Sequence, residues 1–219
     1  MSDEIEKKAI NYLNQHKQKF LERYTQNIYQ TDEKLVVFTA GMSGVGKTEF
    51  AIFLKEQNPN LLHIDTDAIR EFFKPIGYNG QNSDLFQKVA SRGFDELFSF
   101  AMKKGYSMIL DSNFASIQKA KQNIERLLKR AYNIEIVYLY DDPVKCFEYA
   151  IQREVVTKRR VPKDVFLRSN ENSFKTVITI KKIFENKIIL NFIDKRDGSY
   201  YQNIDEEFLK TKIGGDFEF

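Results

Sequence analysis

Hydrophobic positions alternate between two spacings along the chain, and the alternation predicts a layered protein. Short runs of branched and aromatic residues predict five buried strands, at 34–40, 61–65, 106–111, 134–140 and 187–194. Segments at about 47–57, 83–104, 116–131 and 143–158 instead carry apolar residues at helical spacing. This order favours an α/β fold with a doubly wound, mostly parallel five-stranded sheet and helices on both faces.

The start of the chain differs from this alternating part. Apolar residues recur at a near-helical period over residues 3–28, with Lys, Glu and Gln between them, which predicts one amphipathic helix. We therefore expect residues 1–30 to form an N-terminal amphipathic helix packed on the core. Residues 31–219 then form a single domain.

Composition narrows the class of protein. The chain has 219 residues, of which 42% are hydrophobic and 30% charged, as in ordinary soluble domains. Its net charge of +3 is too small to indicate a nucleic-acid-binding protein by itself. Cys146 is the only cysteine, which excludes an intrachain disulfide and favours the cytoplasm. No apolar stretch has the length of a signal peptide or a membrane span, so we expect no membrane partner.

The first chemical motif follows the first predicted strand. The pattern G-x-x-x-x-G-K-T directly behind a strand and at the start of a helix is typical of a P-loop, whose backbone N–H groups surround a phosphate. In such a loop the lysine reaches the β- and γ-phosphates of ATP or GTP, and the final hydroxyl binds Mg²⁺. The candidate nucleotide-binding residues are Gly41, Met42, Ser43, Gly44, Val45, Gly46, Lys47 and Thr48.

Carboxylates follow two further strands. Asp65 and Asp67 end the second strand, with Arg70 one turn beyond, and the carboxyl ends of parallel strands line the crevice where such sheets bind ligands. Asp67 is the candidate general base, although capping of the next helix explains either aspartate equally well. Asp111 ends the third strand in the manner of a carboxylate that holds Mg²⁺.

A basic segment follows the fourth strand. The predicted helix that starts near Pro143 carries Arg153 and runs into Lys158, Arg159 and Arg160. Guanidinium groups on such a segment can close over the phosphates, which predicts a lid at about 150–170. A solvated basic helix end would explain the same residues.

Taken in order, these segments resemble the zeta toxin family of P-loop kinases. The resemblance rests on GMSGVGKTEF, IDTDAIREFF, GYNGQNSDLFQ, ILDSNF and IQREVVTKRRVP, and it spans roughly residues 15–195. It implies a P-loop kinase fold and a phosphotransferase with an alcohol group as acceptor. Asp67 matches the family's catalytic base, Lys47 and Thr48 match its nucleotide and Mg²⁺ residues, and Arg153 and Arg159 match its two lid arginines.

The resemblance also implies an acceptor and a partner. The best-known family activity is 3′-phosphorylation of UDP-N-acetylglucosamine. An antitoxin protein blocks this activity. Asp65, Arg70, Asp111 and Asn113 are the candidate substrate-binding residues. The chain departs from the family where a Glu, a Thr and an Arg grip the sugar nucleotide, because it has Asp111, Asn113 and Ala115 there.

Two other functions stay open at this point. The segment ILDSNF with the downstream R-x-V-P also resembles polynucleotide and aminoacyl-tRNA kinases, although the near-neutral charge does not favour a nucleic-acid acceptor. A nucleotide-dependent interaction protein without transfer activity is the third alternative. His16 and His63 are isolated in the sequence, and we expect neither to bind a metal.

Overall fold

The parallel sheet at the centre of the molecule confirms the predicted fold class. The computed structural model describes residues 2–158 and 162–214. The strands run in the order β2-β3-β1-β4-β5-β6. Their bounds are β1 Leu35–Gly41, β2 Leu62–Asp65, β3 Met108–Asp111, β4 Asn133–Tyr140, β5 Ile189–Asp194 and β6 Ser199–Tyr201. All five predicted strands are present and pair in parallel, and the strand count is corrected by β6, which adds antiparallel to β5.

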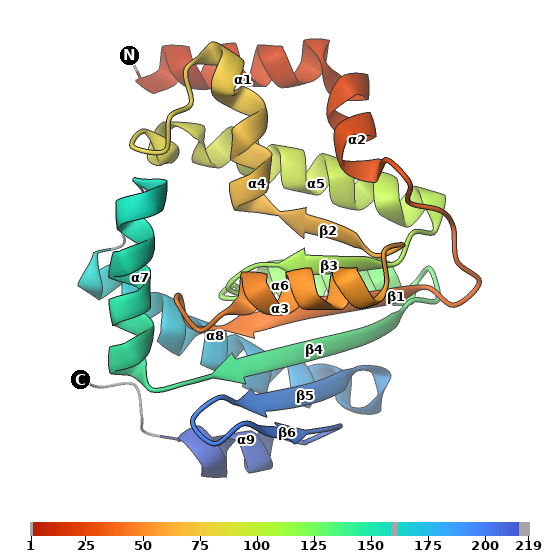
Figure 1. The fold of residues 1–219 in the computed structure, drawn as a ribbon. Helices are drawn as coiled ribbons and strands as arrows, with labels where there is room; N and C mark the ends of the chain where they lie inside the picture. The colour runs from red at the N-terminus through yellow and green to blue at the C-terminus, as the bar shows by residue number, and fades with distance from the viewer. Residues whose placement is uncertain (1, 159–161, 215–219) are drawn as a thin grey trace.

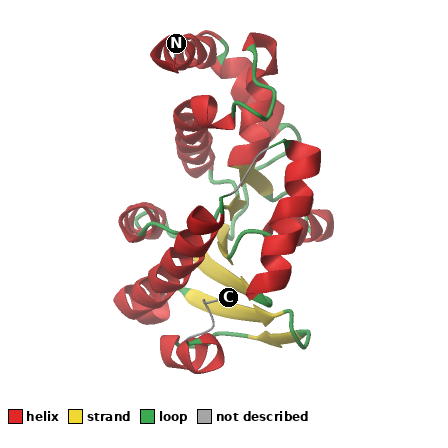
Figure 2. Ribbon diagram, turned by 90° about the vertical axis from the view of Figure 1, so that its left-hand side faces the viewer, coloured by secondary structure: helices red, strands yellow, loops and turns green. Residues whose placement is uncertain are grey.

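Helices cover both faces of this sheet (Figures 1 and 2). Both faces of the central strands are therefore shielded from solvent, and in β1 every residue from Val36 to Gly41 is buried. The longer helices are α3 Lys47–Gln57, α5 Gln87–Lys104, α6 Ile117–Leu128, α7 Pro143–Thr157, α8 Lys163–Phe184 and α9 Glu206–Ile213. Short helical segments lie between them: α4 Thr66–Arg70 and three 3₁₀ turns at Glu71–Ile76, Ser83–Phe86 and Glu185–Lys187.

The prediction of one N-terminal helix over 3–28 is wrong. The segment forms α1, Ser2–Gln15, and α2, Lys17–Thr25, and the backbone leaves helical geometry at His16 (φ −111°, ψ 23°). The break turns α2 downward from α1 (Figure 1), which lets Phe20 bury fully with its ring centroid 5.1 Å from that of Phe72. Helix α1 lies along α5 and the 3₁₀ turn at 71–76. The division into an N-terminal unit and a kinase domain stays a prediction.

Sequence reasoning missed the second half of the β4 to β5 connection. Helix α8 packs beside β1 and α6, and its buried face mixes the apolar Phe166 and Val177 with the polar Asn170, Ser173 and Thr176. The predicted lid at 150–170 therefore contains the end of α7 and the start of α8. Within the described part of the chain, no helix has the length and hydropathy needed to cross a bilayer.

Candidate active site

The P-loop joins β1 to α3 and lies flat on the first turns of α7. Gly44 has φ +78°, and a Cβ at this position would lie 2.0 Å from the Cys146 carbonyl oxygen. Only glycine fits so close to another backbone in that conformation. The base of the loop is fixed from the other side, because the Gly41 N–H donates to Ser173 Oγ of α8 at 3.0 Å.

Lys47 is buried in the curve of this loop. Its Nζ donates to the carbonyl oxygens of Gly41 at 3.1 Å and Met42 at 2.6 Å. Burial lowers the pKa of Lys47 to about 8; Asp111 acts in the opposite direction, and Arg153 adds to the lowering. The ammonium therefore lies within the field of residues from β3 and α7, at the place where a P-loop holds phosphate.

The two aspartates behind β2 have different roles in the structure. Asp65 is the N-cap of α4, with its carboxylate accepting from the backbone N–H groups of Asp67 at 2.9 Å and Ala68 at 3.1 Å. Burial raises the pKa of Asp65, and the neighbouring carboxylates of Asp67 and Asp111 raise it further. The helix-cap explanation thus holds for Asp65, and a substrate contact by this residue stays a prediction.

Asp67 instead faces two arginines. Arg70, whose side chain is only 2% exposed, donates to Asp67 Oδ1 and, through its other terminal nitrogen, to Gln87 Oε1. Arg153 of α7 lies on the outer side, with Nη2 3.6 Å from Asp67 Oδ2. Arg70 is therefore placed to orient the carboxylate, and its predicted substrate contact stays a prediction.

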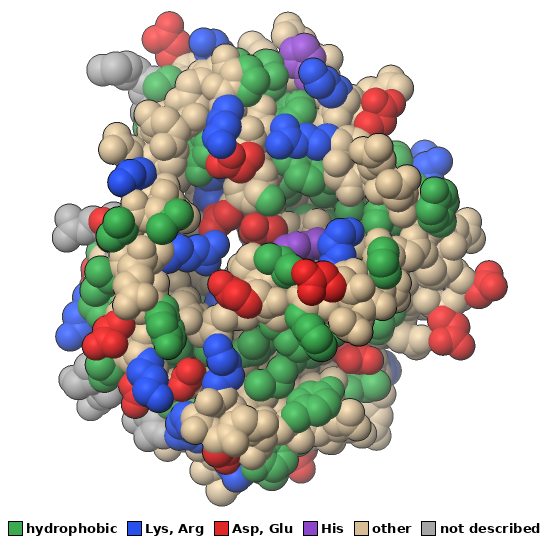
Figure 3. All heavy atoms as spheres, viewed as in Figure 1, with side chains coloured by type: hydrophobic (Ala, Val, Ile, Leu, Met, Phe, Trp, Pro, Cys, Tyr) green, Lys and Arg blue, Asp and Glu red, His purple; other side chains and the backbone are tan. Residues whose placement is uncertain are grey.

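Arg153 lies between the two halves of the site. Its side chain is half exposed, it pairs with Asp67, and its charge also acts on Lys47. One guanidinium group thus pairs with the candidate base and adds to the electrostatic field at the lysine of the phosphate loop. Figure 3 shows acidic and basic side chains gathered around the hollow near the centre of this face.

Asp111 lies at the end of β3, beside Asp65 in the strand register. Its Oδ1 accepts from Thr39 Oγ1 at 3.1 Å, and its Oδ2 lies 3.4 Å from His63 Nε2. Burial alone would raise the pKa of Asp111, but hydrogen bonds from His63 and Thr48 outweigh it and lower the pKa. The carboxylate is therefore held ionised next to the Thr48 hydroxyl.

The oxygen atoms of Thr48 and Asp111 fit Mg²⁺. Mg²⁺ binds through one or two protein oxygens and the phosphates of its substrate. No group of three or more His, Cys, Asp or Glu side chains suited to a metal occurs among the described residues, so a cage built wholly from protein is not present there. The predicted ligand pair stays a prediction that this donor set supports.

Of the remaining predicted residues, Asn113 is among the described residues and Arg159 is not. Asn113 Nδ2 donates to Ser169 Oγ of α8 at 3.1 Å, which ties the loop after β3 to the start of that helix. Arg159 lies outside the described residues. His63, expected to be isolated, contacts Asp111, and the alternation of β2 could have found it because His63 and Asp65 share one side of the strand.

Lys195 is a second residue that sequence reasoning missed. It directly follows β5, and its Nζ donates to the carbonyl oxygen of Val45 in the P-loop at 3.0 Å. Its position behind the carboxyl end of a parallel strand is the available signal, since that edge of the sheet holds the ligand crevice.

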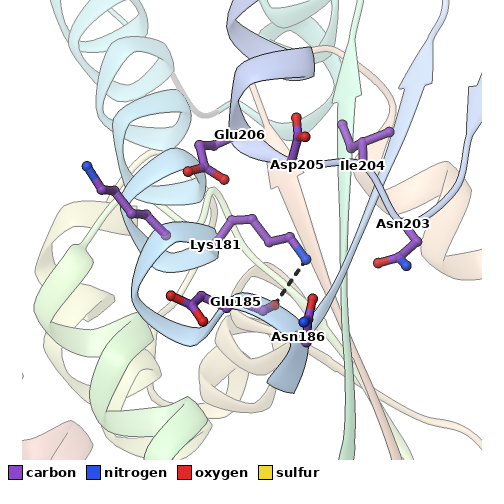
Figure 4. A pocket seen from close by; sticks show the side chains of 8 residues that line it. Lys181, Glu185, Asn186, Asn203, Ile204, Asp205 and Glu206 are labelled. Carbon is purple, nitrogen blue, oxygen red and sulfur yellow. Dashed lines mark hydrogen bonds between the residues drawn. The ribbon is translucent and has the colours of Figure 1, made fainter.

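Another hollow, of about 380 Å³, lies at the opposite edge of the sheet, next to the start of β5 (Figure 4). Lys181 donates there to the carbonyl oxygens of Glu185 at 3.0 Å and Ile188 at 3.1 Å. Burial lowers the pKa of Lys181. This lysine satisfies carbonyl groups where α8 ends, and its role is structural.

Comparisons with known proteins identify the family and the fold. A family model described as Zeta toxin matches residues 18–206. No curated protein matches the sequence. A solved structure from the PezAT chromosomal toxin-antitoxin system of Streptococcus pneumoniae superposes with a TM-score of 0.69 at 14% identity, covering 91% of this chain and 81% of that chain.

Two structures of AvrRxo1-ORF1 with AvrRxo1-ORF2 are also similar. The native complex gives a TM-score of 0.67 at 12% identity, covering 97% of this chain and 70% of that one. The complex with ATP gives 0.64 at 12% identity, covering 96% and 71%. At these identities the likeness establishes the fold.

Proposed function

The chain belongs to the zeta toxin family, and from this premise we propose that it is a kinase that transfers the γ-phosphate of ATP or GTP to a hydroxyl group of a small molecule. The observation that carries the proposal is the position of Arg153, which pairs with Asp67 and acts on the charge of Lys47. A guanidinium group that reaches both a carboxylate base and the field of the phosphate-loop lysine is suited to stabilise the charge of a transferring phosphoryl group.

The donor half of the reaction depends on the P-loop. Backbone N–H groups of the loop and of the first turn of α3 bind the phosphates. Lys47 exchanges the carbonyl oxygens of Gly41 and Met42 for oxygen atoms of the β- and γ-phosphates. Thr48 and Asp111 would hold Mg²⁺, which would supply positive charge to neutralise the phosphate oxygens.

The acceptor half depends on Asp67. Its carboxylate accepts the proton of the acceptor hydroxyl while the hydroxyl oxygen forms its bond to the γ-phosphorus. The bond from that phosphorus to the bridging oxygen breaks, and the nucleoside diphosphate leaves with the electron pair. Arg153 stabilises the charge on the transferring group, and Arg70 keeps the Asp67 carboxylate in place.

The acceptor class we propose is a nucleotide sugar, UDP-N-acetylglucosamine or a related compound. Family membership supports it, and so does the open acceptor side, where Arg153 is half exposed and can also contact an anionic substrate. We further propose an antitoxin partner, because the similar structures include a toxin-antitoxin system. We also propose that the protein acts in the cytoplasm, because its single cysteine suits a reducing compartment.

Transfer of labelled γ-phosphate tests the proposed function. Purified protein is incubated with labelled ATP or GTP and with nucleotide sugars or a bacterial metabolite extract. We expect a labelled product that the Lys47→Ala protein does not form, while Lys121→Ala, which changes an exposed lysine on α6, leaves its yield unchanged. A Lys47→Ala protein that forms the product at the wild-type rate would contradict the proposal.

A further inference from the structure

We propose that Lys195 binds the donor nucleotide at its α-phosphate, next to the nucleoside. The role of Lys195 rests on the proposed kinase function and extends it to a residue outside the P-loop motif. Its ammonium reaches across the sheet to the loop, where Nζ donates to the Val45 carbonyl oxygen at 3.0 Å. An ideal Cβ on Gly46 would lie only 3.0 Å from the same nitrogen, so Lys195 stands directly against the phosphate loop.

The segment that carries Lys195 is fixed on both sides. The Lys195 backbone N–H donates to the Tyr140 carbonyl oxygen at 2.8 Å. The buried Asp194 carboxylate accepts from the Arg196 guanidinium at 2.8 Å, and that guanidinium lies 4.7 Å from the centre of the Tyr140 ring. These contacts hold the backbone before and after Lys195, so its ammonium is delivered to a defined place.

The order of the strands decides which part of the donor lies there. Asp67 follows β2, the P-loop follows β1, and β4 and β5 lie on the other side of β1. In an in-line displacement the leaving oxygen points away from the acceptor. The γ-phosphate therefore faces the β2 side, and the α-phosphate and nucleoside extend toward β4 and β5. Lys195, at the end of β5, is on that side.

Lys195 and Lys47 both act on one neighbouring thiol. Burial and the charge of Asp141 raise the pKa of the Cys146 thiol to about 12, and Lys195 and Lys47 both act against that rise. Lys195 contacts the Val45 carbonyl oxygen from the β5 side of the loop. Because a lysine ammonium has three N–H donors, Lys195 can keep its bond to Val45 and still bind a phosphate oxygen.

Binding of ATP and of inorganic pyrophosphate, measured by titration calorimetry, tests this role. Pyrophosphate fills the β- and γ-sites that Lys47 serves. We expect Lys195→Gln to weaken ATP binding about tenfold and to change pyrophosphate binding less than about twofold, since a charge-assisted hydrogen bond is lost only with ATP. Lys195→Arg should stay within about threefold of wild type for both ligands.

Lys187 is the matched control, because it is an exposed lysine at the other end of β5. Lys187→Gln should bind both ligands as the wild type does. Equal weakening of ATP and pyrophosphate in Lys195→Gln would mean that Lys195 only braces the loop, and unchanged ATP binding would mean that it has no donor contact; either result overturns the proposed role. A wild-type protein that bound neither ATP nor GTP would instead contradict the kinase function itself.

Discussion

The donor side and the acceptor side of the site are built in different ways. The donor side is centred on one continuous stretch, the P-loop, whose backbone binds the phosphates and whose shape depends on Gly44 packed against α7. The acceptor side is assembled from side chains of separate elements, with Asp67 and Arg70 from α4 and Arg153 from α7. We therefore expect the donor side to lose nucleotide binding when its backbone is displaced. We expect the acceptor side to lose activity when a single charge is removed.

The largest effect on nucleotide affinity is expected from Gly44→Ala on the donor side. The new Cβ would lie 2.0 Å from the Cys146 carbonyl oxygen, so the loop must move. We expect nucleotide affinity to fall at least about 100-fold, because the displaced loop loses backbone hydrogen bonds to the charged phosphates, each worth about 1.5–3 kcal/mol. Titration calorimetry measures it. Gly198→Ala is the control, since Gly198 has a similar φ of +77° with nothing within 4 Å. Equal affinities in the two variants would refute the backbone account.

On the acceptor side, Arg153→Ala should lower the rate of phosphate transfer about 30-fold. Removing a buried donor that stabilises a transition state costs about 10²–10³, and Arg153 is half exposed, so the loss should be smaller. The rate is followed with labelled ATP, and nucleotide affinity is measured alongside. Gln152→Ala, on the adjacent exposed position, is the control. A loss confined to nucleotide affinity would place Arg153 on the donor side alone.

Arg70→Gln should lower kcat about tenfold and change KM little, because the carboxylate of Asp67 loses the group that orients it. Steady-state kinetics separates the two constants. Arg70→Lys keeps the charge and should recover part of kcat. If instead KM rises and kcat does not change, Arg70 contacts the acceptor, as the sequence predicts.

The smallest effect is expected where the loop at 77–82 contacts the end of α7. Gly80 has φ +86°, and a Cβ there would lie 2.4 Å from the Thr157 carbonyl oxygen at the end of α7. Gly80→Ala should lower the free energy of unfolding by about 1–2 kcal/mol more than Gly77→Ala, which places a Cβ in open space at φ +109°. Urea unfolding measures both. Equal losses would show that the loop at 77–82 does not bear on α7.

The P-loop is recognisable from the sequence because its residues are contiguous and their spacing is fixed by the phosphate that such a loop surrounds. Asp67 and Asp111 are also predictable, since both follow strands whose carboxyl ends meet at one edge. The sequence leaves open whether Asp65 or Asp67 caps α4. The structure shows that Asp65 is the cap.

Long-range contacts explain what the sequence does not predict. The hydrophobic pattern does not predict helix α8, because Asn170, Ser173 and Thr176 interrupt the apolar period on its buried face. Lys195 contacts Val45, 150 residues away in the sequence, and His63 of β2 contacts Asp111 of the neighbouring strand β3. Local patterns place His63 and Lys195 near the ends of parallel strands, but the contacts themselves are created by the topology of the sheet.

Phosphate transfer by Asp67→Asn, measured beside its nucleotide affinity, tests the central claim most directly. The amide keeps an oxygen that can accept from Arg70 but cannot accept the proton of the acceptor hydroxyl. We predict that transfer falls about 10²–10⁴-fold while ATP affinity changes less than about threefold. Transfer at the wild-type rate would contradict the account, because Asp67 would then not be the base.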